Sequence, residues 1–259
     1  MKTLLISDFD GTLNIPCAQQ KNTMNMEAIQ RFREKGNLFA IATGRSLRSL
    51  SHAFPKWYAY TDFLITQDGA IGYITDGQAV TQLFMFKIPN KETEHIAQVF
   101  KRRAKRCFRD IVFMEGEREL KKHRKDRCTK IRIWCSDAED ARSLHRIFAY
   151  HGYNIRSYFD VERELNHDMH RLSWIHDDMA HAVEISPRGI TKATAIEALK
   201  EHLDEDINIV TVGDDINDIE MIEAFDGFAI NPSPAMESHI LPGHDARSLA
   251  EVIDKVSPL

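Results

Sequence analysis

The chain has 259 residues, of which 43% are hydrophobic and 28% are charged, which excludes a disordered chain and favours two domains or one domain with an insertion. The N-terminal apolar stretch is too short and too soon interrupted for a signal peptide, and no apolar run approaches membrane-spanning length, so we expect a cytoplasmic protein with no membrane partner. The four cysteines are widely spaced, which excludes a Cys-x-x-Cys zinc site and favours reduced thiols.

Three apolar strands are predicted in the first seventy residues. They cover residues 4–6, 38–42 and 63–66, and helices are predicted between them over 24–35 and 46–54. This alternation predicts an α/β fold with a doubly wound parallel sheet. Ligands bind at the carboxyl ends of the strands in such sheets, so the polar residues that follow each strand are candidate site residues.

The pattern changes from about residue 83. Strands are predicted over 80–88, 130–135 and 154–158, and helices over 91–108 and 138–151, the second of them after a capping box formed by Ser136 and Glu139. The half-exposed alternation of the strands predicts an open antiparallel sheet with helices on one side. We therefore expect residues 82–182 to form a small inserted α/β domain.

The doubly wound pattern then resumes. Apolar strands are predicted over 182–185, 207–212 and 227–230, with helices that end near residues 202 and 256. Residues 1–81 and 183–259 are accordingly predicted to form one discontinuous core domain.

Two carboxylates end the first strand, in the stretch SDFDGTL at residues 7–13. Strand alternation sends the side chains of Asp8 and Asp10 the same way, and like charges that close raise one pKa unless a cation lies between them. A divalent metal is the obvious candidate, and Gly11 permits the turn that follows. The simpler interpretation is a strand that runs into an ordinary Asp-Gly turn.

Other polar side chains are predicted at the same sheet edge. Asp214 and Asp8 could supply oxygen ligands for Mg²⁺, a cation that prefers carboxylates, waters and substrate phosphate oxygens. Thr43 offers a hydroxyl and nearby backbone N–H groups, and Lys192 adds a positive charge. Such a set suits a phosphoryl group, whose transfer needs positioning and charge neutralisation. Each piece alone also fits a turn, a solvated lysine or an acidic helix start.

Together these motifs resemble those of the haloacid dehalogenase superfamily of phosphohydrolases, in its Cof-like class IIB, along the whole chain. The four matching motifs are DFDGTL at 8–13, TGR at 43–45, Lys192, and GDDIND at 213–218. Their spacing supports the class, because 35 residues separate Asp8 from Thr43 while 149 separate Thr43 from Lys192, which leaves room for a cap domain. One departure is Asp68, where relatives usually carry Asn before Gly-Ala.

The resemblance implies a catalytic cycle through an aspartyl-phosphate. Asp8 would be the nucleophile, and Asp10 the general acid towards the leaving alcohol and then the base for water. Mg²⁺ would be held by Asp8, Asp214 and the backbone carbonyl of Asp10. The remaining residues would support the phosphoryl group: Thr43 and Lys192 on its oxygens, Asn217 on the phosphate or the metal shell, Asp218 orienting Lys192 or metal-bound water, and Gly44 and Arg45 contacting substrate.

A strongly basic segment lies in the predicted insertion. Residues 101–132 contain fourteen Lys or Arg and five Asp or Glu, a local charge of +9 in a chain whose net charge is −5. It admits three interpretations: a solvated face, steering of polyanionic substrates such as bisphosphates or nucleotides, and nucleic-acid binding. The acidic net charge and the absence of a recognisable aromatic platform argue against nucleic acid. A polar cluster at residues 162–170 is either a specificity loop of the cap or a solvated turn.

The sequence therefore predicts a Mg²⁺-dependent phosphatase, a phosphoric monoester hydrolase that acts on a small phosphorylated metabolite such as a sugar phosphate or similar organophosphate. One alternative is a phosphomutase, which shares the aspartyl-phosphate but returns the phosphoryl group to the sugar. Another is a non-catalytic regulatory or nucleic-acid-binding module that uses the basic segment. We expect no obligate protein partner.

Overall fold

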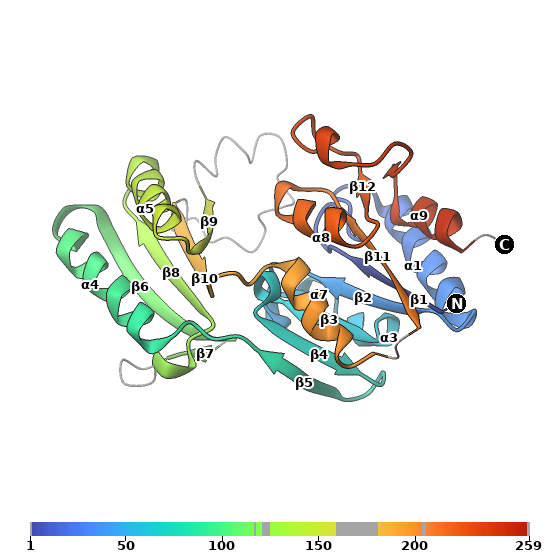
Figure 1. Cartoon of the computed structure of the whole chain (residues 1–259), viewed down its shortest axis with the longest axis horizontal. Helices are drawn as coiled ribbons and strands as arrows, with labels where there is room; N and C mark the ends of the chain where they lie inside the picture. The colour runs from blue at the N-terminus through green and yellow to red at the C-terminus, as the bar shows by residue number, and fades with distance from the viewer. Residues whose placement is uncertain (1, 117, 121–124, 159–180, 204–205, 258–259) are drawn as a thin grey trace. The chain divides into compact units, whose positions relative to one another are not determined.

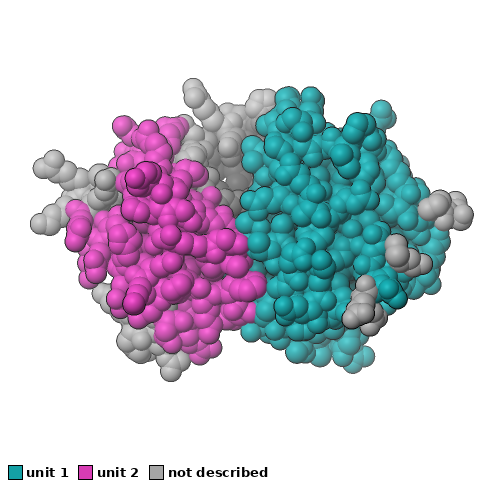
Figure 2. All heavy atoms as spheres, viewed as in Figure 1, with its two compact units in different colours: residues 1–45, 50–84, 191–259 teal, residues 46–49, 85–190 magenta. Residues whose placement is uncertain are grey.

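A computed structural model describes residues 2–116, 118–120, 125–158, 181–203 and 206–257 (Figure 1). The chain divides into two compact units, which Figure 2 distinguishes by colour. Unit 1 comprises Met1–Arg45, Leu50–Phe84 and Thr191–Leu259, and unit 2 comprises Ser46–Ser49 and Met85–Ile190. Each unit contains its own β-sheet and its own hydrophobic core.

Unit 1 is built on an eight-stranded sheet whose order is β13-β12-β11-β1-β2-β3-β4-β5. Its strands are β1 (Lys2–Ser7), β2 (Leu38–Ala42), β3 (Phe63–Thr66), β4 (Ile71–Thr75), β5 (Val80–Met85), β11 (Ile207–Gly213), β12 (Phe228–Ile230) and β13 (Asp245–Ala246). The pairs from β13 to β3 are parallel, and β4 runs antiparallel to β3. The predicted doubly wound α/β fold is confirmed.

Helices cover both faces of this sheet. Leu4 and Ile6 of β1 form one core cluster with residues of α7 (Lys192–Lys200) and α8 (Ile219–Ala224). The alternate residue Leu5 is also fully buried and points to the opposite face, where α1 (Gln19–Glu34) contacts β2 and α9 (Leu249–Val256). Burial on both faces explains why the central strands are apolar throughout instead of alternating.

The loop after β1 is tied to these helices by one buried amide. Asn25 of α1 donates from its side-chain nitrogen to the carbonyl of Leu13 at 3.0 Å. Its side-chain oxygen accepts from the backbone N–H of Ala250, also at 3.0 Å. A single polar side chain therefore connects α1, α9 and the loop that follows Asp8 and Asp10. Two short helices, α2 (Leu47–Ala53) and α3 (Trp57–Tyr60), lie between β2 and β3.

Unit 2 carries a five-stranded antiparallel sheet in the order β7-β6-β8-β10-β9. Its strands are β6 (Phe108–Glu115), β7 (Arg118–Glu119), β8 (Lys130–Cys135), β9 (Asn154–Tyr158) and β10 (Ala182–Ser186). Helices α4 (Asn90–Cys107) and α5 (Ala138–Tyr150) share one core cluster with the same face of β8 and β10. The expected antiparallel sheet with helices on one side is present.

Two strands lie in a different sheet from the predicted one. The sequence predicted that the core domain resumes at residue 183, but β10 pairs with β8 and β9 in the sheet of unit 2. Its apolar residues resemble those of a buried parallel strand because both of its faces are buried. Conversely, β5 was largely assigned to the insertion, yet it forms an edge of the core sheet, where the half-exposed pattern of its side chains is typical.

The start of α5 also differs from the prediction. The sequence indicated a capping box that begins at Ser136, whereas the N-cap is Asp137, whose side chain accepts from the backbone N–H of Asp140 at 2.8 Å. Both residue types cap helices, and Asp137 has the extended backbone that an N-cap requires.

The second face of the sheet in unit 2 contains two buried charged side chains, Lys130 and Glu184, and the partly exposed Arg132. Glu184 of β10 accepts from Lys130 Nζ at 2.9 Å and from Arg132 Nε at 2.7 Å, both on β8. Burial alone would raise the pKa of Glu184, but the two cations outweigh it and lower that pKa to about 2. Two basic residues of segment 101–132 are therefore ion-paired within unit 2, and one carboxylate offsets one of their two charges.

Replacing Glu184 with Gln is expected to destabilise unit 2 by about 3 kcal/mol at pH 7, because it leaves Lys130 buried without a counter-charge. A depressed carboxyl pKa contributes stability above the unfolded value of 4.5, and the contribution is lost as the pH falls towards 2. The free energy of unfolding, measured in urea, should therefore fall more steeply for the wild type than for the variant as the pH is lowered from 4.5 towards 2.

A matched control is Glu197→Gln, since the pair of Glu197 with Lys200 is about half exposed. That change should cost less than about 1 kcal/mol. Equal losses from both substitutions would contradict a stabilising role for the buried group.

Two further expectations concern membrane spans and the polar cluster. Among the described residues no helix is both long and apolar enough to cross a membrane. The polar cluster predicted at residues 162–170 lies outside the described residues.

Candidate active site

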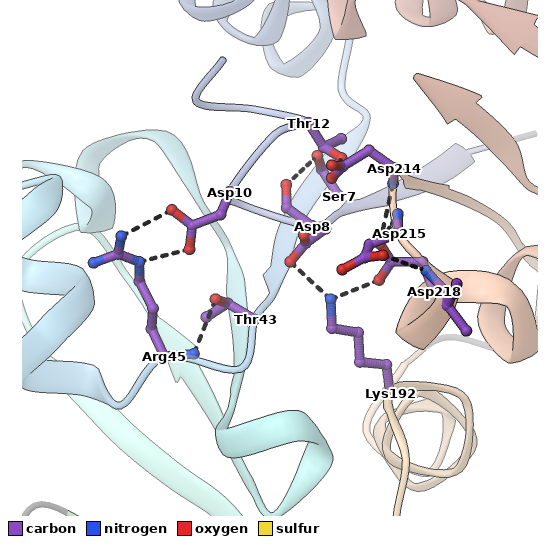
Figure 3. A network of polar contacts seen from close by, with 11 residues as sticks. Ser7, Asp8, Asp10, Thr12, Thr43, Arg45, Lys192, Asp214, Asp215 and Asp218 are labelled. Carbon is purple, nitrogen blue, oxygen red and sulfur yellow. Dashed lines mark hydrogen bonds and ion pairs between the residues drawn. The ribbon is translucent and has the colours of Figure 1, made fainter. Parts of the chain in front are cut away.

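The predicted site residues meet at one edge of the unit 1 sheet (Figure 3). Asp8 follows β1, Thr43 follows β2 and Asp214 follows β11, and these three strands are parallel neighbours. The ladders continue past the strand ends, because Asp8 donates its backbone N–H to Val212 at 2.8 Å and Thr43 donates to Ile65 at 2.9 Å. The backbone thus fixes where these side chains start.

Lys192 links two of the acids. It is the first residue of α7, and its ammonium donates to Asp8 Oδ1 at 2.7 Å and to Asp218 Oδ1 at 2.6 Å. The side chain of Lys192 is only 2% exposed. Thr191 and Thr194 form a capping box at the start of α7, which holds the helix end from which Lys192 extends.

Asp218 organises the turn that carries Asp214. Its Oδ2 accepts from the backbone N–H groups of Asp214 at 3.0 Å and Asp215 at 3.2 Å, while its Oδ1 binds Lys192. The close approach requires Gly213, since a Cβ at that position would lie 2.3 Å from Cβ of Asp218. Asp218 therefore acts on the site through its neighbours.

The buried part of this site has a shortage of positive charge. Three carboxylates, those of Asp8, Asp214 and Asp218, lie together with one ammonium, that of Lys192. Burial raises the pKa of Asp8 well above its usual value, Lys192 opposes this effect, and the other two acids add to it. For Lys192, burial would lower the pKa, but Asp218 and Asp8 outweigh it and the pKa rises. The ammonium therefore stays charged.

These residues fit a divalent cation. One carboxylate oxygen from each of Asp8, Asp214 and Asp218 lies within 4.8 Å of the others. Thr12 donates its hydroxyl to Asp214 Oδ1 at 2.7 Å, which orients that carboxylate. Both oxygens of Asp218 already accept hydrogen bonds, so Asp8 and Asp214 are the better candidate ligands. Hard oxygen donors with surplus negative charge suit Mg²⁺.

The side chain of Asp10 points away from this acidic cluster, as Figure 3 shows. Arg45 binds both of its oxygens, with Nε at 2.6 Å from Oδ2 and Nη2 at 2.8 Å from Oδ1. The two acids that strand alternation would place side by side therefore have different cationic partners: Lys192 for Asp8 and Arg45 for Asp10. The sequence predicted a substrate contact for Arg45 and did not indicate this pair.

A short turn at residues 67–69 contacts both the loop of Thr43 and the start of α7. Gln67 donates its backbone N–H to the carbonyl of Arg45 at 3.0 Å, and Asp68 donates to that of Thr43 at 3.2 Å. Gln67 and Asp68 both have positive φ, 54° and 57°. Gly69 follows with φ of +106°, and a Cβ there would lie 2.3 Å from the carbonyl oxygen of Thr191. No side chain fits between these two segments.

The other predicted residues are less closely involved. Gly44 lies between Thr43 and Arg45 in the loop, and Asn217 lies on the turn η4 (Ile216–Asp218), where its side chain is exposed. Thr43 is buried, and its hydroxyl oxygen accepts from the backbone N–H of Arg45 at 3.1 Å. That N–H group, which the sequence interpretation offered to an anion, is thus already occupied. No local pattern in the sequence indicates the contacts of Thr12 and Gly69.

Comparison with known families now decides the affiliation of the chain. The family model of haloacid dehalogenase-like hydrolases matches residues 5–235. The chain belongs to this family. The match includes Asp8, Thr43, Lys192 and Asp214, the residues that meet at the sheet edge, and the resemblance predicted from the motifs is confirmed. A search of curated proteins found no match.

Solved structures of this hydrolase family have the same fold. A protein described as a HAD/COF-like hydrolase from Plasmodium vivax is 21% identical with a TM-score of 0.71, covering 98% of this chain and 95% of that one. A HAD phosphatase from Bacteroides thetaiotaomicron is 16% identical with a TM-score of 0.70, covering 99% and 94%. A sugar phosphatase of HAD subclass IIB is also 16% identical, with a TM-score of 0.67 and complete coverage of both chains.

Proposed function

We propose that this hydrolase is a Mg²⁺-dependent phosphomonoesterase that acts on a small phosphorylated metabolite, a sugar phosphate or similar organophosphate, through an aspartyl-phosphate on Asp8. The observation that supports this most directly is the buried contact of Lys192 with Asp8, beside two further carboxylates and the hydroxyl of Thr43. The phosphatases and the sugar phosphatase among the solved structures of this fold point the same way.

In the first step, a carboxylate oxygen of Asp8 forms a bond to phosphorus while the bond between phosphorus and the leaving oxygen breaks. Asp10, as an acid, gives its proton to that leaving oxygen, so the product is a neutral alcohol. In the second step, water attacks phosphorus as Asp10 takes its proton, and the bond from phosphorus to Asp8 breaks. Inorganic phosphate leaves, and both carboxyl groups return to their starting forms.

The neighbouring residues would hold the phosphoryl group in line. Lys192 and the Thr43 hydroxyl would bind its oxygens, with Gly44 and Asn217 as further contacts. Asp8, Asp214 and the backbone carbonyl of Asp10 would hold Mg²⁺, which supplies charge neutralisation for the nucleophile and the phosphoryl oxygens. Asp218 would keep Lys192 and the Asp214 turn in place through the three hydrogen bonds that it accepts.

We also propose that unit 2 is the cap domain that selects the leaving group. Support comes from its place in the chain, between β5 and α7, and from its separate sheet and core. Unit 1 is then the hydrolase core.

Removal of divalent metal should silence the enzyme. With 4-nitrophenyl phosphate as substrate, excess EDTA is expected to lower the rate of phosphate release by about 10³-fold or more, because Asp8 would then be buried among acids with Lys192 as its only close cation among the described residues. The measurement is phosphate release before chelation, after chelation, and after addition of excess MgCl₂, which should restore the rate.

A calcium-loaded sample is the matched control, since Ca²⁺ prefers more ligands and a looser geometry than Mg²⁺. A rate that is unchanged in EDTA would exclude the metal role. Release of phosphate from a panel of phosphorylated metabolites, compared by kcat/KM, would then identify the substrate class.

A further inference from the structure

The ion pair of Arg45 with Asp10 involves the carboxyl group that the proposed cycle assigns as proton donor and acceptor. Both oxygens of Asp10 accept from one guanidinium, at 2.6 and 2.8 Å. The side chain of Arg45 is 9% exposed and that of Asp10 is 32% exposed. A bidentate contact of this kind fixes the plane and direction of the carboxylate more strictly than a lysine could.

Arg45 is itself firmly placed. Its backbone N–H donates to the Thr43 hydroxyl at 3.1 Å, and its carbonyl accepts from Gln67 at 3.0 Å. Its guanidinium lies 5.4 Å from the ring centre of Phe9, which in turn stacks on Phe54. The backbone and the guanidinium are thus both anchored, so Arg45 can serve as a fixed reference for the side chain that it binds.

We infer that Arg45 is a positioning residue for Asp10: it holds the carboxyl group apart from the acidic cluster and fixes the direction in which that group faces the leaving oxygen. This inference rests on the proposed function and deepens it. The guanidinium occupies only the lone pair of each oxygen that faces it. The proton for the leaving group therefore lies on the side of the carboxyl group that faces away from Arg45, and the contact with Arg45 sets the direction of the proton transfer.

Arg45 could bind the phosphoryl group or position Asp10, and these two roles have different effects on different substrates. A residue that only binds the phosphoryl group affects all substrates equally, because the phosphoryl group is common to them. A residue that positions Asp10 matters most where the leaving oxygen needs a proton as its bond to phosphorus breaks. An alkoxide needs that proton, whereas 4-nitrophenolate is stable enough to leave without it.

The test compares kcat/KM for glycerol 2-phosphate and for 4-nitrophenyl phosphate, in the presence of Mg²⁺. This parameter covers the steps up to departure of the leaving group. In Arg45→Met and in Arg45→Lys, we expect the ratio of aryl to alkyl kcat/KM to rise by about 10-fold or more over the wild type. Arg45→Lys should have a higher kcat/KM than Arg45→Met for both substrates, because it keeps the positive charge. Its ratio of aryl to alkyl kcat/KM should not return to the wild-type value.

The Asp10→Asn background adds a readout that a merely structural role would not move. There the ratio should already be high, and adding Arg45→Met should not raise it further, because the group that Arg45 positions has gone. Additive effects in the double variant would overturn the inference.

The chain offers a matched control in Arg33, which binds Asp62 through the same two nitrogens at 3.1 and 2.8 Å. Arg33→Lys and Arg33→Met should leave the ratio unchanged. A ratio that is also unchanged in both Arg45 variants of an active enzyme would overturn the inference while the proposed function stands. A wild type that releases no phosphate from either substrate would instead overturn the proposed function, and the inference with it.

Discussion

Asp8→Asn is expected to lower the rate of phosphate release by on the order of 10⁴-fold or more, because the amide cannot form the bond to phosphorus that the proposed cycle requires. The structure allows this change without loss of the fold. The amide oxygen of Asn can still accept from Lys192, and removing one of three neighbouring acids relieves like-charge repulsion.

The measurement is kcat with 4-nitrophenyl phosphate, together with mass spectrometry of the protein quenched in acid during turnover. The wild type should carry a phosphoryl group that maps to Asp8, and the variant should not. Asp76→Asn is the control, since Asp76 is exposed in the turn between β4 and β5 and the chemical change is the same. Turnover retained at more than one part in a hundred would contradict the assignment of the nucleophile.

Lys192→Met is expected to cost both activity and stability. Removal of the ammonium leaves Asp8 and Asp218 buried without their cation, and breaking a buried ion pair costs about 3–5 kcal/mol. The turn that carries Asp214 should loosen as well, because Asp218 orients it through two backbone hydrogen bonds. Since the proposed contact with the phosphoryl group and the proposed metal site are disturbed together, kcat/KM should fall by about 10³-fold or more.

Thermal unfolding with and without MgCl₂ checks the cause. A divalent cation should stabilise the variant more than the wild type, because it would replace the charge that Lys192 supplied. Lys200→Met is the matched control: it lies at the other end of α7, and its side chain is 49% exposed. If the two variants were equally stable, the contacts of Lys192 would contribute nothing to the fold.

Much of the site could be predicted because its position follows from strand order. Asp8, Thr43 and Asp214 each come directly after an apolar strand, and parallel neighbours place those ends together. Lys192 was harder, since it follows a strand of unit 2. Its motif in the family resemblance indicated it, while its hydrogen bonds to Asp8 and Asp218 depend on how α7 packs against the core sheet.

What could not be predicted are contacts between segments that have no pattern in common. Arg45 and Asp10 are 35 residues apart, and Thr12 and Asp214 are 202 apart, so neither pair is visible in a local window. The pairing of β10 with strands of unit 2 could not be predicted for a related reason. An isolated Glu in an apolar strand does not reveal that Lys130 and Arg132 neutralise it on the neighbouring strand.

Unit 1 is assembled from both ends of the chain, since β1 lies between β2 and β11, and Lys192 reaches an acid 184 residues before it. On the ribosome, β1 therefore emerges early and keeps one edge unpaired until residues 207–213 follow. The five strands of unit 2 come from a single continuous stretch and can pair in the meantime. A nascent chain can thus complete unit 2 before the site at the edge of the unit 1 sheet, and Asp8 gains its neighbours Lys192, Asp214 and Asp218 only after that unit has been synthesised.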